Sequence, residues 1–131
     1  MTENELSYQI RGAIFEVYNH FGPGLYEQVY EAAMMIELTS RGIARVGAQV
    51  PFDVAYKGNP LALGFRMDLL VDDKVIVEIK SVKKLQDVHF KQLDTYLKLT
   101  GKKLGILVNF NTADLTKSIH RRVNGLSDDW R

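Results

Sequence analysis

Hydrophobic residues recur along the first forty positions with the period of an amphipathic helix. The spacing i, i+3, i+4, i+7 connects Ile10, Ala13, Ile14, Val17, Tyr18 and Phe21. This pattern stops at Gly22-Pro23-Gly24, a strong break. A second segment rich in Ala, Met, Glu and Leu predicts another helix from about Leu25 to Arg41, ended by Gly42.

The period changes to two after Gly42. Apolar residues alternate at Val50, Phe52, Val54 and Tyr56, and again at Leu61, Leu63, Phe65, Met67, Leu69 and Val71. Residues 57–60 separate these runs as a turn, and Asp72-Asp73 leads into a third run at residues 75–80. The pattern predicts three strands joined as consecutive antiparallel hairpins.

The last third of the chain predicts one more helix and at least one strand. The helix covers about Leu85 to Thr100 and ends at Gly101, and residues 103–110 form an apolar run typical of a strand buried on both faces. The tail from Thr112 fits either a helix or an edge strand. We therefore expect an α/β fold of a single domain, residues 1–131, with element order ααβββαβ and helices covering a mixed sheet.

Composition is that of an ordinary globular domain. Of 131 residues, 46% are hydrophobic and 25% are charged, and there is no cysteine for a disulfide or thiolate metal site. The polar N-terminus and the lack of a long apolar stretch favour a cytoplasmic protein with no membrane association. The net charge of +1 neither requires nor excludes a nucleic-acid partner.

Two charges interrupt the most apolar strand. Glu78 and Lys80 lie two residues apart and therefore share a face. Asp68 lies on the neighbouring strand, and a tight hairpin would bring it close to Glu78. Grouped carboxylates repel each other, so this arrangement needs exposure to water, a salt bridge to Lys80 or a divalent cation. Oxygen ligands of this kind suit Mg²⁺ or Mn²⁺.

Asp68 followed by Glu78-Ile79-Lys80 resembles the signature of the PD-(D/E)XK nuclease superfamily. The stretch Gly24 to Tyr30 matches G-x-x-E-x-x-Y, so the chain also resembles the GxxExxY proteins of that superfamily. The stretches "GPGLYEQVYEAA", "FRMDLLVDDKVIVEIKSV", "VHFKQLDTYLKLTG" and "LVNFN" carry the resemblance along nearly the whole chain. One departure is Met67, which stands where the superfamily name has proline.

The resemblance implies a restriction-endonuclease-like three-layer sandwich and a metal-dependent nuclease, with DNA preferred over RNA as substrate. It implies that Asp68, Glu78 and the Ile79 carbonyl hold Mg²⁺ or Mn²⁺, helped by Glu27, and that Lys80 positions the attacking water. Gln92 and Tyr96 resemble a Gln-x-x-x-Tyr motif that contacts DNA. The further candidates for substrate binding are His89, Tyr30 and Arg66.

Plainer interpretations stay open for several of these residues. Glu27 is favoured near a helix N-terminus in any case, Tyr30 is a common core residue, and His89 can be an ordinary polar residue. Arg66 can pair with Asp68 rather than reach a phosphate. The alternative function is a module that keeps the fold and binds nucleic acid or a protein without cleaving, and activity only as a homodimer also stays open.

Overall fold

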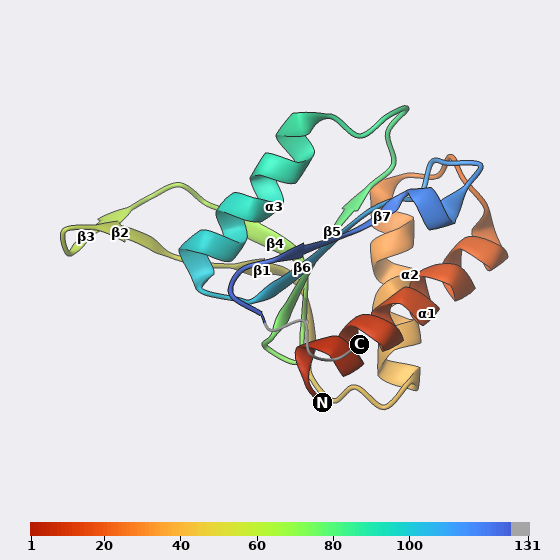
Figure 1. The fold of residues 1–131 in the computed structure, drawn as a ribbon, viewed down its shortest axis with the longest axis horizontal. Coiled ribbons are helices and arrows are strands. Elements are labelled where there is room, and N and C mark those ends of the chain that lie inside the picture. Colours follow the sequence, from red (N-terminus) through yellow and green to blue (C-terminus); the bar gives the residue numbers. More distant parts are fainter. Residues whose placement is uncertain (127–131) are drawn as a thin grey trace.

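A mixed five-stranded sheet lies at the centre of the computed structural model, which describes residues 1–126, and helices cover both faces of the sheet (Figure 1). Its strands follow the order β1-β4-β5-β6-β7, and only β5 and β6 run parallel within the described residues. The elements are α1 (Glu3–Phe21), α2 (Glu27–Ser40), β1 (Val46–Pro51), β2 (Val54–Tyr56), β3 (Asn59–Leu61), β4 (Arg66–Val71), β5 (Val75–Lys80), α3 (Asp87–Thr100), β6 (Leu104–Asn109), the 3₁₀ turn η1 (Leu115–Lys117) and β7 (Ile119–Val123).

The three expected helices are confirmed, and local chemistry sets their ends. Thr2 caps α1 and forms a capping box with Glu5, which satisfies two backbone N–H groups at the start of the helix. Gly101 ends α3 in the left-handed conformation. Among residues 1–126, no helix combines the length and the apolar character needed to cross a bilayer.

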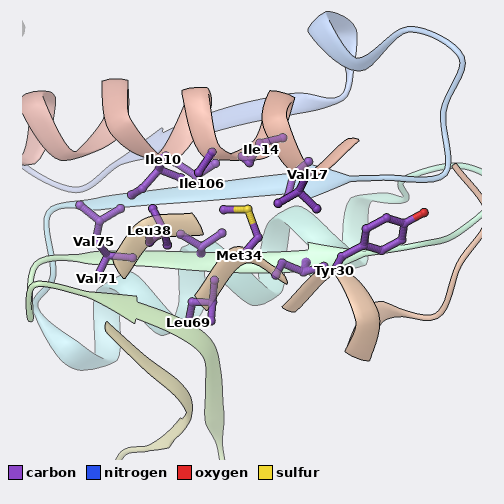
Figure 2. Packing of buried hydrophobic residues seen from close by; sticks show 14 of the residues in the cluster. Ile10, Ile14, Val17, Tyr30, Met34, Leu38, Leu69, Val71, Val75 and Ile106 are labelled. Carbon is purple, nitrogen blue, oxygen red and sulfur yellow. The ribbon is translucent and has the colours of Figure 1, made fainter. Parts of the chain in front are cut away.

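Two hydrophobic cores lie on opposite faces of the sheet. The larger core packs α1 and α2 against one face, and Figure 2 shows part of it. Its labelled members are Ile10, Ile14, Val17, Tyr30, Met34, Leu38, Leu69, Val71, Val75 and Ile106. The smaller core packs α3 against the other face through Met67, Ile76, Leu93, Tyr96, Leu97 and Leu107. Alternate residues of β5 therefore serve different cores, which explains its almost unbroken apolar sequence.

The expected strand bounds need correction between residues 50 and 71, although the predicted antiparallel pairing of the first run with the second is present as β1 with β4. Both long alternating runs are divided: β1 ends at Pro51, and β4 begins only at Arg66. Pro51 lacks an N–H for a continuing ladder, and Gly64 has φ 68°, which turns the chain out of a strand. As a result β1 pairs directly with β4, while β2 and β3 form a separate hairpin that projects from the body of the molecule (Figure 1).

The tail that sequence left open contains both a turn and a strand. Leu115–Lys117 form the 3₁₀ turn η1, whose Leu115 is buried in the larger core. Residues Ile119–Val123 then form β7, which pairs antiparallel with β6 at the edge of the sheet. The parallel pairing of β5 with β6 aligns Lys80 with Asn109, a contact that matters for the site.

Candidate active site

The backbone ladder between β4 and β5 stops just before Asp68 and Glu78. The last paired residues are Leu69 and Val77. Beyond them, side-chain carboxylates accept the hydrogen bonds of the backbone. The Asp68 N–H donates to Oε2 of Glu78 over 2.8 Å, and the Ile79 N–H donates to Oδ2 of Asp68 over 2.8 Å. Each carboxylate thus replaces a carbonyl of the ladder and is held by the opposite strand. The structure brings together the two acids that the sequence predicts to meet.

At the level where the ladder breaks, the apolar side chains of β1 and β4 switch from one face of the sheet to the other. Val46 and Leu69 pack in the core under α1 and α2, whereas Val50 and Met67 pack in the core under α3. In a regular strand, residues two or four apart share a face, so β1 and β4 both reverse at the same level. Gln49 lies at that level with φ 51°, a left-handed conformation that is uncommon for a residue other than glycine. The expected regular alternation of Met67 and Leu69 is therefore wrong.

Little positive charge lies near the carboxylates of Asp68 and Glu78. Glu78 is 1% exposed, and burial together with the charge of Asp68 raises the pKa of Glu78 to about 8. Burial also raises the pKa of Asp68, although the Ile79 N–H and the charge of Lys80 oppose the rise. No basic group of residues 1–126 lies within 4.0 Å of either carboxylate as an ion pair. Among these residues, Lys80 therefore forms no salt bridge with Asp68 or Glu78. Its charge acts on the two carboxylates only from a longer distance.

Two asparagines fix the backbone that follows Lys80. Asn109 is buried, and its amide group accepts from the Val82 N–H over 3.0 Å and donates to the Val82 carbonyl over 2.9 Å. Asn111 donates to the same carbonyl over 3.2 Å, and the Phe110 N–H donates to the Lys80 carbonyl over 2.9 Å. The start of the loop is therefore held by four hydrogen bonds to the segment that follows β6 or ends it. These asparagines belong to the stretch "LVNFN", but the sequence did not assign them this role.

Glu27 connects α2 to the same loop. Its Oε2 atom accepts from the Ser81 N–H over 3.0 Å, and the Ser81 hydroxyl donates to the Leu25 carbonyl over 2.6 Å. One oxygen of Glu27 therefore accepts a hydrogen bond from the protein, which leaves the other for a metal. The metal-binding role of Glu27 stays a prediction. Within residues 1–126, no three Asp, Glu or His side chains form a preassembled metal-binding group.

Two residues that the sequence did not single out, Gln49 and Glu31, lie beside the acidic pair. The Gln49 side-chain amide donates to Oε2 of Glu31 over 2.8 Å and to Oδ1 of Asp68 over 3.3 Å. Burial and the charges of Asp68 and Glu27 raise the pKa of Glu31. The sequence did contain a signal for Glu31, because it follows Glu27 by four residues and therefore lies on the same face of the helix. Gln49 gave no signal, because a left-handed residue inside a strand cannot be read from its sequence.

The α3 candidates are connected to one another and to the smaller core. Gln92 donates to the Tyr96 hydroxyl over 3.1 Å, and the buried Tyr96 ring packs against Phe52 and Phe65. His89 has a local structural role, because its Nδ1 atom accepts from the Gln86 N–H over 2.9 Å and closes a capping box. Contacts of these residues with substrate stay predictions.

Tyr30 and Arg66 occupy different environments. Tyr30 is fully buried and stacks on Phe110 with ring centroids 4.3 Å apart. Its hydroxyl donates to the Gly22 carbonyl over 2.7 Å and accepts from the Leu25 N–H over 3.1 Å. It therefore supports the loop before Glu27 from within the core, and its predicted contact with substrate stays a prediction. Arg66 is exposed at the start of β4, with no ion pair to Asp68 among the described residues.

Comparison with known proteins gives one informative match. The family model described as PDDEXK_3, PD-(D/E)XK nuclease superfamily, matches residues 4–123. None of the curated proteins matches the sequence. A solved structure described as "Crystal structure of SSO0001" is similar with a TM-score of 0.48 and 20% identity, over 93% of this chain and 79% of that one. A structural likeness at that level adds nothing on function.

Proposed function

The chain belongs to the PD-(D/E)XK nuclease superfamily, and we propose that it is a divalent-metal-dependent nuclease that hydrolyses phosphodiester bonds in DNA. Membership itself suggests nuclease activity and implies nucleic acid as partner. The metal, the choice of DNA and the residue roles are the added proposal. The observation that carries them is the reciprocal hydrogen bonding of Asp68 and Glu78 where β4 and β5 part.

The donor atoms around this pair fit a hard divalent cation. Each carboxylate gives one oxygen to a backbone N–H. The other oxygen of Asp68 has only a 3.3 Å contact with Gln49, and that of Glu78 accepts no hydrogen bond from residues 1–126. Two carboxylate oxygens and the Ile79 carbonyl leave other positions for water and a substrate phosphate, as Mg²⁺ and Mn²⁺ prefer. Glu27 and Glu31 are candidates for additional support, directly or through water.

Burial of the pair also supports this proposal. Burial raises the pKa values of both acids, and the charge of Asp68 raises that of Glu78 further. A divalent cation, when bound there, compensates both charges, lowers the pKa of water and polarises a phosphoryl oxygen. Lys80, at the end of β5, orients the attacking water and stabilises negative charge that develops on the phosphate. The water oxygen forms a bond to phosphorus while the bond from phosphorus to the leaving sugar oxygen breaks.

The chain's own scaffold keeps these groups in place. The Asn109 contact with Val82 and the Glu27 contact with Ser81 fix the backbone directly after Lys80. A catalytic group held by a rigid supporting shell needs little reorganisation when substrate arrives. Gln92 and Tyr96 are proposed to contact the DNA, as their resemblance to the Gln-x-x-x-Tyr motif suggests.

A cleavage assay tests the proposal. Labelled single- and double-stranded DNA is incubated with Mg²⁺, Mn²⁺ or EDTA, and the wild type is compared with Asp68→Asn and Lys80→Ala. We expect metal-dependent cleavage that falls by about 100-fold or more in each variant, as for loss of a group that stabilises transition-state charge. The exposed Lys117 provides a matched control, since Lys117→Ala removes a lysine outside the site.

Three outcomes would contradict the nuclease proposal or its site. Cleavage that persists in EDTA, or in both site variants, would place the reaction elsewhere or in a contaminant. DNA binding without cleavage under every metal condition would favour the alternative of a non-cleaving module on the same fold.

A further inference from the structure

An exposed tyrosine lines a surface pocket that shares residues with the candidate active site. Tyr26 directly precedes α2, and its side chain is 84% exposed. The pocket has a volume of about 630 Å³. It is lined by Gly24, Leu25, Tyr26, Glu27, Gln28, Ser81 and Asn111.

The Tyr26 side chain is not anchored by polar or aromatic contacts with the part of the chain that the structure describes. Within residues 1–126 its hydroxyl forms no hydrogen bond, and its ring contacts no other aromatic ring. Tyr30 and Tyr96, in contrast, are buried and use both ring and hydroxyl within the protein. An aromatic side chain left in water beside a pocket offers a flat surface to a ligand.

The chemistry of the lining favours an uncharged, flat ligand. No lysine or arginine of the described residues lines the pocket, and Glu27 contributes a carboxylate, so the lining does not suit a phosphate. The amide of Gln28 and the side-chain oxygen of Asn111 are free of hydrogen bonds with residues 1–126, since Asn111 uses only its NH₂ group to bind Val82. Amide groups beside an aromatic ring can pair with the polar edge of a nucleobase.

The pocket also adjoins the groups proposed to act on the phosphate. It shares Glu27 and Ser81 with that site, where the two residues are joined by a hydrogen bond of 3.0 Å. Ser81 directly follows Lys80 in the chain. A nucleotide strand with a phosphate at Asp68 and Glu78 can therefore lead a neighbouring base towards Tyr26.

We propose that Tyr26 and this pocket bind an unpaired nucleobase, with the base stacked on the tyrosine ring and its edge facing Gln28 and Asn111. This inference rests on the proposed nuclease function for its choice of ligand. It deepens that function by naming the substrate class as single-stranded DNA or an unpaired end, since a base inside a duplex has no free face to stack.

Binding without catalysis tests the subsite separately from the nuclease proposal. The affinity of the full chain for a fluorescent single-stranded oligodeoxythymidine of about 12 nucleotides, within the range of single-strand site sizes, is measured by anisotropy in EDTA, with a blunt duplex of equal length as comparison. Tyr26→Ala should weaken single-strand binding about 10-fold, the usual effect of losing one base–aromatic stack. Tyr26→Phe keeps the ring and should stay within about twofold of the wild type.

The exposed Tyr8 on α1 supplies the matched control, because its side chain is 76% exposed and it does not line this pocket. Tyr8→Ala should leave binding unchanged. Equal binding by Tyr26→Ala and wild type overturns the subsite, as does an equal loss in Tyr8→Ala or no single-strand binding at all. Tyr26-dependent binding by a chain that never cleaves DNA upholds the subsite while the nuclease proposal fails. Metal-dependent cleavage together with Tyr26-independent binding overturns the subsite while the nuclease proposal stands.

Discussion

Replacing Glu78 by glutamine should remove the contribution that this carboxyl group makes to the pH dependence of the protein's stability. The folded chain holds Glu78 with a pKa of about 8, whereas the unfolded chain releases the same proton near the ordinary value of 4.5. Between these values the folded state binds more protons than the unfolded state, so the free energy of unfolding falls as pH rises. Stability from this group is fully present below pH 4.5 and is lost as pH rises through about 8.

The structure sets the size of the effect. The two pKa values differ by about 3.5, and at about 1.4 kcal/mol for each pKa unit the loss reaches about 5 kcal/mol. The expected effect at pH 8 is therefore several kcal/mol. Glutamine keeps the shape of the side chain but carries no charge, and so Glu78→Gln should be more stable than wild type at pH 8 by that amount.

Urea unfolding between pH 5 and pH 8.5 in EDTA measures the difference. Comparing the two proteins at each pH cancels the opposite contribution of His120, whose pKa is lowered by burial and by Arg122. Glu16→Gln, at an exposed position, serves as the control and should follow the wild type. Wild-type stability that stays level or rises over this range relative to Glu78→Gln would refute the reasoning from burial.

Three further predictions concern groups around the site. Tyr30→Phe should lower the free energy of unfolding by about 1–3 kcal/mol in urea titration, because the Gly22 carbonyl and the Leu25 N–H lose their buried partner. Asn109→Ala should cost a similar 1–3 kcal/mol by the same assay and also slow cleavage, since the Val82 backbone is released beside Lys80; unchanged cleavage would contradict that role. Gln49→Gly should be more stable than Gln49→Ala by about 1 kcal/mol, because φ is 51° there, and equal stability would speak against the left-handed conformation.

Sequence predicted the central hairpin because its information is local. Asp72 and Asp73, at φ 53° and 56°, form the tight turn that their residue type allows, and the turn fixes the register of the flanking strands. Once that register is fixed, Asp68 must meet Glu78. The reciprocal hydrogen bonds between them follow from the same geometry, although their effect on the ladder was not foreseen.

What sequence did not predict depends on contacts between distant segments. The alternating run from Leu61 to Val71 reads as one strand, yet it is interrupted: Asn59–Leu61 pair with Val54–Tyr56 in a separate hairpin, and only Arg66–Val71 join the central sheet. Gln49 joins Glu31 to Asp68 only because α2 packs beside β1 in the folded chain. Likewise the burial of Tyr30 follows from its stacking on Phe110, eighty positions later in the sequence.

The proposed chemistry requires that one divalent cation binds both Asp68 and Glu78. Crystals of the full chain soaked in Mn²⁺ and measured at the manganese absorption edge give an anomalous map that locates the ion. We predict a peak between the carboxylates of Asp68 and Glu78, within coordination distance of one oxygen of each, with Lys80 beside it. A map in which Mn²⁺ binds elsewhere, or in which the Lys80 amine fills the space between the two acids, would contradict the proposed metal site.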